Sequence, residues 1–459
     1  MLYFWPMNFL LKPDPRSPDL SLRGSAQRRR VLKALALSAP VGAFGLSIPG
    51  KLAAQLTIEI IGGGADQIPI TVVPFGAEEA QSNRLSEVIA ADLARSGRFK
   101  LQAVGSVRPL PTEPGEVNYR FWKNQGNQTL VIGRLSERND GKIDVRFRLM
   151  DTTKEAQLLG YSYTVGPAQI RATAHKIADQ IYEKLTGEPG VFSTRIAYVA
   201  RHPNRFELHV ADADGFNSQF ILAHREPVIS PAWSPEGNRI AYVSFEQRKA
   251  IVFLHDLQKG TRTIVANYEG SNSAPAWAPD GERLAVVLSK DGVSQLYSVR
   301  PDGNDLVRLT NSNAIDTEPS FSPDGKTVLF TSDRGGSPQI YRMRTSGGAA
   351  ERVTFEGNYN VTPRYSPDGK SFAFIQRAQG RYSLAIMDFA SRQMQALTDG
   401  QFDGSPTFAP NGRLVLYASI VKGRGILAAV SSDGRIKQKI TASAQDVREP
   451  AWGPLVGNR

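Results

Sequence analysis

From residue 195 onward, short apolar runs alternate with polar turns at a regular interval. Each interval contains a Pro-x-aromatic segment, a turn and an apolar run, and the first full motif is Pro231-Ala-Trp-Ser-Pro-Glu-Gly237. The motif prolines are Pro231, Pro275, Pro319, Pro363, Pro406 and Pro450, which lie 44, 44, 44, 43 and 44 residues apart. Four short antiparallel strands in about 44 residues are typical of one β-propeller blade. The repeat therefore predicts a β-propeller.

Each turn is followed by a run of strand length. These runs are Arg239–Ser244, Arg283–Leu288, Thr327–Ser332, Ser371–Gln376 and Leu414–Ser419. A further run, Arg195–Ala200, has no Pro-x-aromatic segment before it, and the last segment, at Pro450, has no run after it. Pairing these two ends would complete one more blade and remove the exposed sheet edges. The sequence predicts a closed six-bladed propeller over residues 188–459.

The motif residues have physical roles in such a blade. Proline presets φ in the Ser-Pro-Asp-Gly turn, and glycine supplies the positive φ at its end. An aromatic residue occupies the same position in all six copies, which are Trp233, Trp277, Phe321, Tyr365, Phe408 and Trp452. An aromatic side chain there can fill the wedge between neighbouring sheets and bury on the order of 150–250 Å². We interpret these residues as core rather than as a ligand cage.

Residues 55–187 follow another pattern and predict a small α/β domain. Helices are expected over Ala80–Ser96 and from Pro167 to Leu185, where apolar residues recur at helical spacing. Strands are expected at Leu56–Ile61, Ile70–Phe75, Leu130–Leu135, Ile143–Met150 and Gln157–Val165. An Asn-Asp-Gly turn joins the third and fourth of these strands as a hairpin. The Pro-rich stretch Arg108–Gly115 is expected to be a loop.

Residues 1–54 have the features of a leader. Three basic residues, Arg28-Arg29-Arg30, precede an apolar run from Ala34 to Ile48, and Leu52-Ala53-Ala54 offers a small-residue cleavage site. This order is typical of a secretory signal, and the run is shorter than the roughly 20 apolar residues of a spanning helix. Three interpretations stay open: a twin-arginine signal, a Sec signal and an uncleaved anchor. After cleavage we expect no direct membrane insertion.

Composition narrows the class of partner. The net charge is +11, but residues 1–54 hold eight basic and two acidic residues and so carry six of these charges. The remaining five charges are spread over some four hundred residues, which gives no support for binding nucleic acid. The chain has no cysteine, so disulfides, thiolate metal sites and a cysteine nucleophile are excluded.

Motifs with catalytic or ligand-binding potential favour structural explanations. Gly62-Gly63-Gly64 is followed by no helix, which favours a turn over a phosphate cradle. Asp212-Ala-Asp214-Gly215 lacks the rest of a calcium loop and is expected to be a β-turn. The five histidines show no metal-ligand spacing, and they are His175, His202, His209, His224 and His255. We therefore expect no cofactor and no bound metal.

An enzyme remains the alternative to a binding protein. A serine hydrolase with a propeller would need a Gly-x-Ser-x-Gly elbow and a downstream histidine, and the chain has no such elbow and no histidine after His255. The alternative that stays open is a lyase or hydrolase that acts on a periplasmic sugar or peptide in the propeller channel. We expect a non-enzymatic binding protein.

Several joining segments resemble the TolB family. They are Ile70-Thr-Val-Val-Pro-Phe75, Glu183-Lys-Leu-Thr-Gly187 and Thr194-Arg-Ile-Ala-Tyr-Val199, followed by the propeller repeats in the family's order. The resemblance covers almost everything after residue 55. It implies a periplasmic scaffold of the Tol-Pal system that supports outer-membrane integrity and constriction in cell division. It further implies two protein partners, the outer-membrane lipoprotein Pal and the inner-membrane protein TolA, for a chain expected to be monomeric by itself.

The resemblance also places two binding sites on this sequence. The segment implied to bind TolA comprises Gln55, Leu56, Thr57, Ile58, Glu59, Ile60 and Ile61. From its residues alone, this segment could be the first strand of the α/β domain or a strand added to a partner's sheet. The candidates for Pal are expected in loops before the repeat prolines, and they are Asn272, Ser273, Asp316, Thr317, Glu318, Arg448 and Glu449. The loop at Asn272 departs from the histidine-containing form of some family members.

Overall fold

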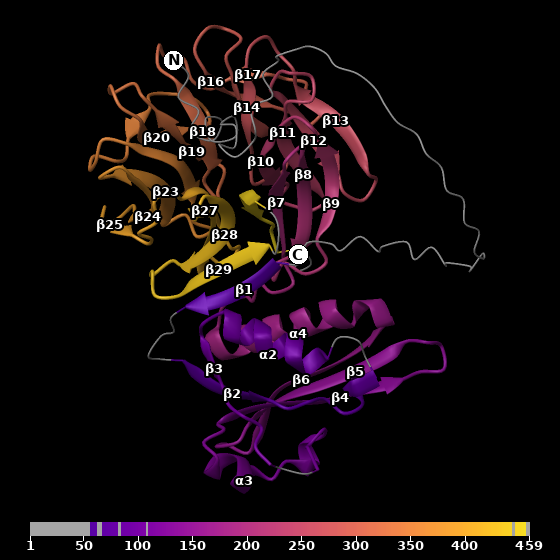
Figure 1. Cartoon of the computed structure of the whole chain (residues 1–459). Coiled ribbons are helices and arrows are strands. Elements are labelled where there is room, and N and C mark those ends of the chain that lie inside the picture. The colour runs from indigo at the N-terminus through magenta and orange to yellow at the C-terminus, as the bar shows by residue number, and fades with distance from the viewer. Residues whose placement is uncertain (1–55, 62–66, 81–83, 107–108, 443–445, 456–459) are drawn as a thin grey trace, which may run out of the picture. The chain divides into compact units, whose positions relative to one another are not determined.

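The structure is a computed structural model, and it describes residues 56–61, 67–80, 84–106, 109–442 and 446–455. Residues 53–459 form one compact unit. The predicted leader, Gln55 and Gly62-Gly63-Gly64 lie outside the described residues. The described part of the chain contains an α/β domain and a six-bladed propeller (Figure 1).

The predicted six blades are confirmed, and each is an antiparallel sheet. Blade 1 consists of β30 (Asp446–Trp452), β7 (Arg195–His202), β8 (Arg205–Asp212) and β9 (Gln219–His224). Blade 2 consists of β10 (Val228–Trp233), β11 (Arg239–Ser244), β12 (Ile251–Asp256) and β13 (Thr261–Ala266). Blade 3 consists of β14 (Asn272–Trp277), β15 (Leu284–Leu288), β16 (Gln295–Val299) and β17 (Val307–Arg308).

The remaining blades repeat this order. Blade 4 consists of β18 (Asp316–Phe321), β19 (Thr327–Ser332), β20 (Gln339–Arg344) and β21 (Glu351–Arg352). Blade 5 consists of β22 (Asn360–Tyr365), β23 (Ser371–Ala378), β24 (Arg381–Asp388) and β25 (Met394–Ala396). Blade 6 consists of β26 (Gly404–Phe408), β27 (Leu414–Val421), β28 (Arg424–Ser431) and β29 (Lys437–Ala442).

Ring closure occurs where the sequence places it. The strand β30 pairs antiparallel with β7, and Trp452 lies opposite Ile196. The inner strands β30, β10, β14, β18, β22 and β26 neighbour one another around the ring. The last described strand therefore supplies the inner strand that blade 1 lacks in its own part of the sequence.

The turns and aromatic residues of the repeat behave as expected. The turn glycines have positive φ, for example 69° at Gly237 and 74° at Gly281. The indole Nε1 of Trp233 donates to the Ala451 carbonyl of blade 1, and that of Trp277 donates to the Ala232 carbonyl of blade 2. Because each indole reaches the preceding blade, the motif aromatic joins neighbouring sheets as well as filling space between them.

The α/β domain is a five-stranded mixed sheet with the order β3-β2-β4-β5-β6. Its strands are β2 (Ile68–Val72), β3 (Phe99–Leu101), β4 (Thr129–Glu137), β5 (Ile143–Asp151) and β6 (Ala156–Val165). Its α-helices are α2 (Leu85–Arg95), α3 (Tyr119–Asn124) and α4 (Ile170–Thr186), and its 3-10 turns are η1 (Glu78–Ala80), η2 (Pro114–Glu116) and η3 (Pro167–Gln169). The apolar sides of α2 and α4 pack on one sheet face, and Trp122 of α3 packs on the other.

The strand β1 (Leu56–Ile61) does not belong to the α/β sheet, although the sequence pattern allowed it to be the first strand of that domain. It pairs antiparallel with β29 as a fifth, outermost strand of blade 6, so that Ile58 lies opposite Ile440 (Figure 1). Ile58 packs against the apolar cluster that includes Ile440 and Ile196. The edge of blade 6 is thus completed by a segment nearly four hundred residues away in the sequence, which no local pattern reveals.

Candidate partner-binding surfaces

The candidates before the repeat prolines do not lie in loops, which corrects the expectation from the sequence. Asn272 and Ser273 begin β14, Asp316, Thr317 and Glu318 begin β18, and Arg448 and Glu449 lie within β30. All three strands are the inner strands of their blades. The loop expectation is wrong because the ladder of each blade begins several residues before the proline.

Two of these candidates are wholly buried and form internal hydrogen bonds. Asn272 has no exposed surface, and its amide donates to the carbonyls of Ala250 and Tyr268. Asp316 also has no exposed surface, and its carboxylate accepts two hydrogen bonds of 2.9 Å from Arg334 Nη2. Since their polar atoms are satisfied inside the protein, these two side chains have a structural role and cannot reach a partner directly.

The residue immediately before each repeat proline has an unusual backbone. Its φ lies between 46° and 57° in all six blades, at Ser230, Ala274, Glu318, Thr362, Ser405 and Glu449. Each of these residues lies at a β-bulge where the register of the inner strand shifts. A non-glycine residue at positive φ costs of order 1–3 kcal/mol, and bulges redirect side chains. The six residues, here called the bulge ring, occupy equivalent places around the propeller axis.

Two members of the bulge ring are acidic and come from opposite blades. Glu449 in blade 1 accepts from the Ser230 N–H and the Ser405 hydroxyl. Glu318 in blade 4 accepts from the Thr331 hydroxyl at 2.7 Å and the Thr362 N–H at 2.8 Å. Burial raises the pKa of both carboxyls, although these hydrogen bonds act to lower it.

An arginine couples the two acids. Arg364 follows the proline of blade 5, and its Nη1 donates to the Pro363 carbonyl. Its charge acts on both Glu318 and Glu449, while burial lowers its own pKa. Two carboxylates and one guanidinium thus act on one another from the inner strands of blades 1, 4 and 5. Glu318, Arg364 and Glu449 are half-buried. Charged side chains in such a position can exchange their internal partners for charged groups of a bound protein.

The bulge ring and the α/β domain belong to opposite ends of the propeller. The inner strands begin beside the ends of the second strands, as Asn272 opposite Leu288 shows. The segment that directly follows the α/β domain contacts the turn at the other end of blade 6, between its inner and second strands. There Arg413 forms an ion pair with Glu188, and the Asn411 amide donates to the Pro189 carbonyl. Gln438 of β29 also donates to the Arg95 carbonyl.

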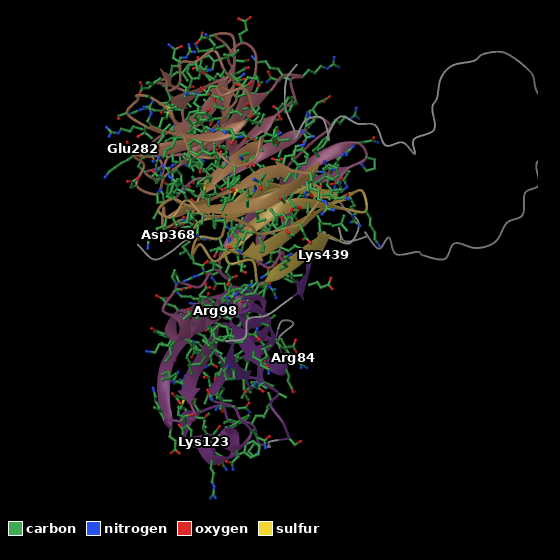
Figure 2. All side chains as sticks on the ribbon, turned by 90° about the vertical axis from the view of Figure 1, so that its left-hand side faces the viewer. Arg84, Arg98, Lys123, Glu282, Asp368 and Lys439 are labelled. Carbon is green, nitrogen blue, oxygen red and sulfur yellow. The ribbon has the colours of Figure 1, made fainter. Side chains whose placement is uncertain are left out.

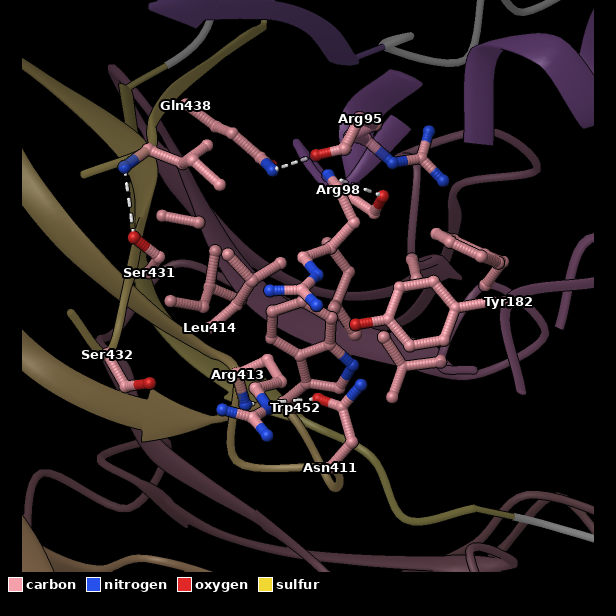
Figure 3. A pocket seen from close by; sticks show the side chains of 18 of the residues that line it. Arg95, Arg98, Tyr182, Asn411, Arg413, Leu414, Ser431, Ser432, Gln438 and Trp452 are labelled. Carbon is pink, nitrogen blue, oxygen red and sulfur yellow. Dashed lines mark hydrogen bonds between the residues drawn. The ribbon is translucent and has the colours of Figure 1, made fainter. Parts of the chain in front are cut away.

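A cavity of about 90 Å³ lies at this junction (Figure 3). Arg98 and the hydroxyl of Tyr182 point into it, and Trp452 and Leu414 form its apolar wall. The cavity is smaller than the roughly 150 Å³ that accommodate benzene and far smaller than the roughly 300–1,000 Å³ of a typical ligand pocket. Its size fits a side chain rather than a substrate or cofactor.

The same junction contains a buried charged network. Asp92 of α2, His175 of α4 and Asp214 after β8 bring ligand-type atoms within 4.8 Å of one another. Arg95 pairs with Asp92, and Arg171 pairs with Asp214. Burial alone would lower the pKa of His175, but the hydrogen bond and charge of Asp92 and the charge of Asp214 together raise it. A cation here would compete with two guanidinium groups, so the donor set fits an ion-pair network better than a metal site.

Sequence reasoning missed several of these residues. Arg364 and the neutral members of the bulge ring could have been found by aligning the six repeats on their prolines, because each precedes or follows the proline by one position. The network of Asp92, His175 and Asp214 gives no such signal, since its members come from two helices and a propeller turn. The expected turn at Asp212–Gly215 is present, with the Gly215 N–H bound to the Asp212 carbonyl.

The structure describes most of the segment that the family resemblance implies to bind TolA. Leu56, Thr57, Ile58, Glu59, Ile60 and Ile61 form β1, whereas Gln55 lies outside the described residues. The segment pairs with β29 over its whole length, from Leu56 opposite Ala442 to Ile61 opposite Lys437. It therefore occupies an outer sheet edge within its own chain, which is the kind of contact that a partner's sheet could replace.

The fold and these surfaces define a class: a two-domain propeller protein with an α/β domain at one end and a charged bulge ring at the other. Family models for the TolB amino-terminal domain and the TolB beta propeller domain match residues 56–158 and 182–456. The chain belongs to the TolB family. In the described residues, the helices are too short or too polar to cross a membrane.

Individual relatives agree with this assignment. A protein of Aromatoleum aromaticum named Tol-Pal system protein TolB is 64% identical over 88% of this chain and 94% of its own length. A protein of the same name from Methylobacillus flagellatus is 56% identical over 90% of this chain and 96% of its own. The crystal structure of TolB from Acinetobacter baumannii has a TM-score of 0.81 and 38% identity, covering 87% of this chain and 100% of that one. Two of these relatives are thus named as proteins of the Tol-Pal system, and the third as TolB.

Proposed function

We propose that this protein is a periplasmic scaffold that links the outer-membrane lipoprotein Pal to the inner-membrane protein TolA. In this role it supports outer-membrane integrity and invagination of the envelope during cell division. Family membership supports a Tol-Pal role. The bulge ring and β1 are two separate surfaces, and in this proposal each would bind one partner. The proposed domain limits are 1–54 for the leader, 55–187 for the α/β domain and 188–459 for the propeller.

The observation that carries the Pal site is the pair of acidic residues on opposite blades. Glu318 and Glu449 share the bulge position, and Arg364 acts on both. Thr317 and Arg448 precede them and are half-buried, so a partner that enters along the axis would meet these four candidates together. We propose Asn272, Ser273 and Asp316 as supports that fix the inner strands beneath this site.

Binding to purified Pal, measured by calorimetry, tests this site. Glu318→Gln and Glu449→Gln each remove a charge from a carboxyl whose pKa burial already raises, so the variants should fold. We expect each to weaken Pal binding by about tenfold or more. Glu282→Gln is the matched control, because Glu282 is exposed at the turn before β15, at the other end of the propeller (Figure 2). Unchanged affinity in both acidic variants would exclude the bulge ring as the Pal site.

For TolA, we propose that β1 leaves β29 and adds to a sheet of the partner. The strand is outermost in its blade, and blade 6 keeps its four other strands without it. Main-chain hydrogen bonds would supply the affinity of such an exchange, and alternate side chains of the segment Gln55–Ile61 would supply its specificity.

A disulfide that locks β1 in place tests the exchange. Glu59 lies opposite Lys439, and the chain has no cysteine of its own, so Glu59→Cys with Lys439→Cys introduces a single defined pair. We expect the oxidised variant to lose TolA binding, to regain it on reduction and to keep Pal binding throughout. The two single-cysteine variants are the controls. Full TolA binding by the oxidised protein would exclude β1 as the exchanged strand.

A further inference from the structure

The strand β6 leaves one side of the α/β sheet open. It is the last strand in the order β3-β2-β4-β5-β6 and, among the described residues, pairs with β5 only (Figure 1). A bulge opposite Leu149 and Met150 interrupts its first residues, so its regular part is Leu159–Val165. This part contains no proline and no charged residue. Natural proteins usually protect such an edge with charges, proline or a covering segment, because free backbone groups there can pair with another chain.

Arginines gather on one face of the sheet beside this edge. Arg134 of β4 and Arg146 of β5 lie directly opposite each other, and Arg148 follows on the same face. Among the described residues, none of the three has a carboxylate within ion-pair distance. Like charges directly opposite each other destabilise a sheet. The row therefore offers positive charge at an exposed place, where Glu116 and Asp144 act on Arg134 and Arg146 only from beyond ion-pair distance.

A glycine brings this charge to β6. The side chain of Arg148 lies across β6 at Gly160, where an added Cβ would come within 2.6 Å of Arg148 Cδ. The guanidinium Nη1 then donates to the carbonyls of Phe147 and Tyr161. Two bonds from one nitrogen leave the other donors of the guanidinium available. Any side chain larger than glycine at residue 160 would displace this arginine.

The opposite face of β6 is aromatic. Tyr161 lies beside Phe147 and Tyr163, with ring centroids 6.0 Å and 6.4 Å away. The hydroxyl of Tyr163 donates to Gln180 on α4, which fixes that ring, whereas Tyr161 remains 45% exposed. A residue placed next to Tyr161 from outside the sheet would cover its exposed ring.

We propose that the β6 edge binds an extended segment of a partner protein, in which acidic residues alternate with apolar ones. The segment would add as a sixth strand to the sheet, with carboxylates on the face of Arg146 and Arg148 and apolar side chains on the face of Tyr161. A residue on the added strand would lie two strand spacings, about 10 Å, from the Arg146 backbone. An extended arginine and a glutamate side chain together cover that distance. This site is separate from the bulge ring and from β1.

Binding of a fluorescent peptide in which glutamate alternates with valine tests the proposal on the purified full chain. We expect it to bind about tenfold or more tightly than a peptide in which lysine alternates with valine. A third peptide keeps the glutamates but has proline at its centre, and it should bind weakly because it cannot continue a ladder. Hydrogen exchange should show protection of Leu159–Val165 by the first peptide only.

Arg146→Gln should weaken binding of the glutamate peptide about twofold to fivefold. The matched control is Arg84→Gln, which removes an exposed arginine before α2 in the same domain (Figure 2). Equal affinity for the glutamate and lysine peptides, or equal effects of the two substitutions, would overturn the charge assignment. Tight binding of the proline peptide, or protection outside β6, would overturn strand addition.

Discussion

The two terminal strands of the described chain, β1 and β30, both complete a propeller sheet from a distance, but they do so differently. The strand β30 takes the inner position of blade 1, where Val447 is fully buried and Trp452 donates to Thr194 Oγ1. The strand β1 takes a fifth, outer position on a blade that already has four strands. One strand is necessary for a closed ring, and the other is an addition to it.

The position of a strand in its sheet decides whether the fold depends on that strand or can release it. An inner strand contacts both neighbouring blades, so its loss would expose apolar surface on three sheets. An outer strand has one ladder and one packed side, so its detachment exposes much less. A chain that must keep its fold while releasing a segment can do so only with a strand of the second kind.

The largest effect is expected from removal of β30. A chain that ends at residue 445 leaves the inner edge of β7 unpaired and uncovers Ile196, Tyr198 and their neighbours. The loss should approach the whole stability of the propeller, about 5 kcal/mol or more. Thermal unfolding followed by circular dichroism should show no cooperative transition of the propeller. A chain shortened only by residues 456–459 serves as the control, and a truncated protein with an unchanged transition would contradict the closure argument.

A smaller effect is expected at the interface where the ring closes, here called the closing seam. Trp233→Ala acts where blade 2 meets the distant strand β30, and Trp277→Ala acts between blades 2 and 3, which follow each other in the sequence. Both should lower the free energy of unfolding by about 3–5 kcal/mol, because both indoles are nine-tenths buried and donate one hydrogen bond. Denaturant titration measures both. A much smaller loss for Trp233 would mean that the closing seam is looser than the others.

Removal of β1 should cost far less than removal of β30. A chain that begins at residue 62 loses the ladder to β29 and the contact of Ile58, and keeps the four remaining strands of blade 6. We expect a loss of about 1–2 kcal/mol, which lowers the unfolding temperature by about 5 °C or less. Differential scanning calorimetry checks this. A loss as large as that of the β30 truncation would refute the distinction between the two strands.

The smallest effects concern two buried histidines, whose contributions to stability depend on pH in opposite directions. The pKa of His175 is raised above its ordinary 6.5 by Asp92 and Asp214, against the effect of burial, so its stabilisation is present below pH 6.5 and lost as pH rises through the folded-state pKa. Burial lowers the pKa of His209 despite Glu207, so its contribution is present above pH 6.5 and lost as pH falls through the folded-state pKa.

Unfolding of His175→Gln and His209→Gln across pH 5 to 9 checks both signs. The destabilisation by His175→Gln should shrink as pH rises, and that by His209→Gln should shrink as pH falls. Parallel profiles for the two variants would show that at least one of these assignments is wrong.

The propeller could be predicted closely because its sequence motif recurs in six copies. The expected strands Arg239–Ser244 and Thr327–Ser332 agree with β11 and β19 to the residue, since turn glycine and apolar run recur together. The α/β domain has no internal repeat, so each of its elements has to be predicted from a single stretch of sequence. The short elements β3 and α3 were missed there, and the helix after Pro167 begins with a 3-10 turn before α4.

The candidate sites could be predicted only in outline. The repeat prolines located the inner strand of each blade, but not that Asn272 and Asp316 are buried or that Glu318 and Glu449 share a bulge with positive φ. Whether a polar residue next to a proline is exposed depends on where the ladder begins, and that depends on the neighbouring strand. The charged network at His175 and the arginine row beside β6 arise from contacts between separate elements.

By itself, the sequence determined the number of blades, the turns between strands and the closure of the ring, because each follows from local periodicity and from counting its incomplete copies. The tertiary structure alone decided that β1 joins β29, that β6 keeps an open edge, and which polar residues face the propeller axis. Those outcomes depend on which distant surfaces meet when the chain folds, and a strand's own residues specify its shape but not its neighbour.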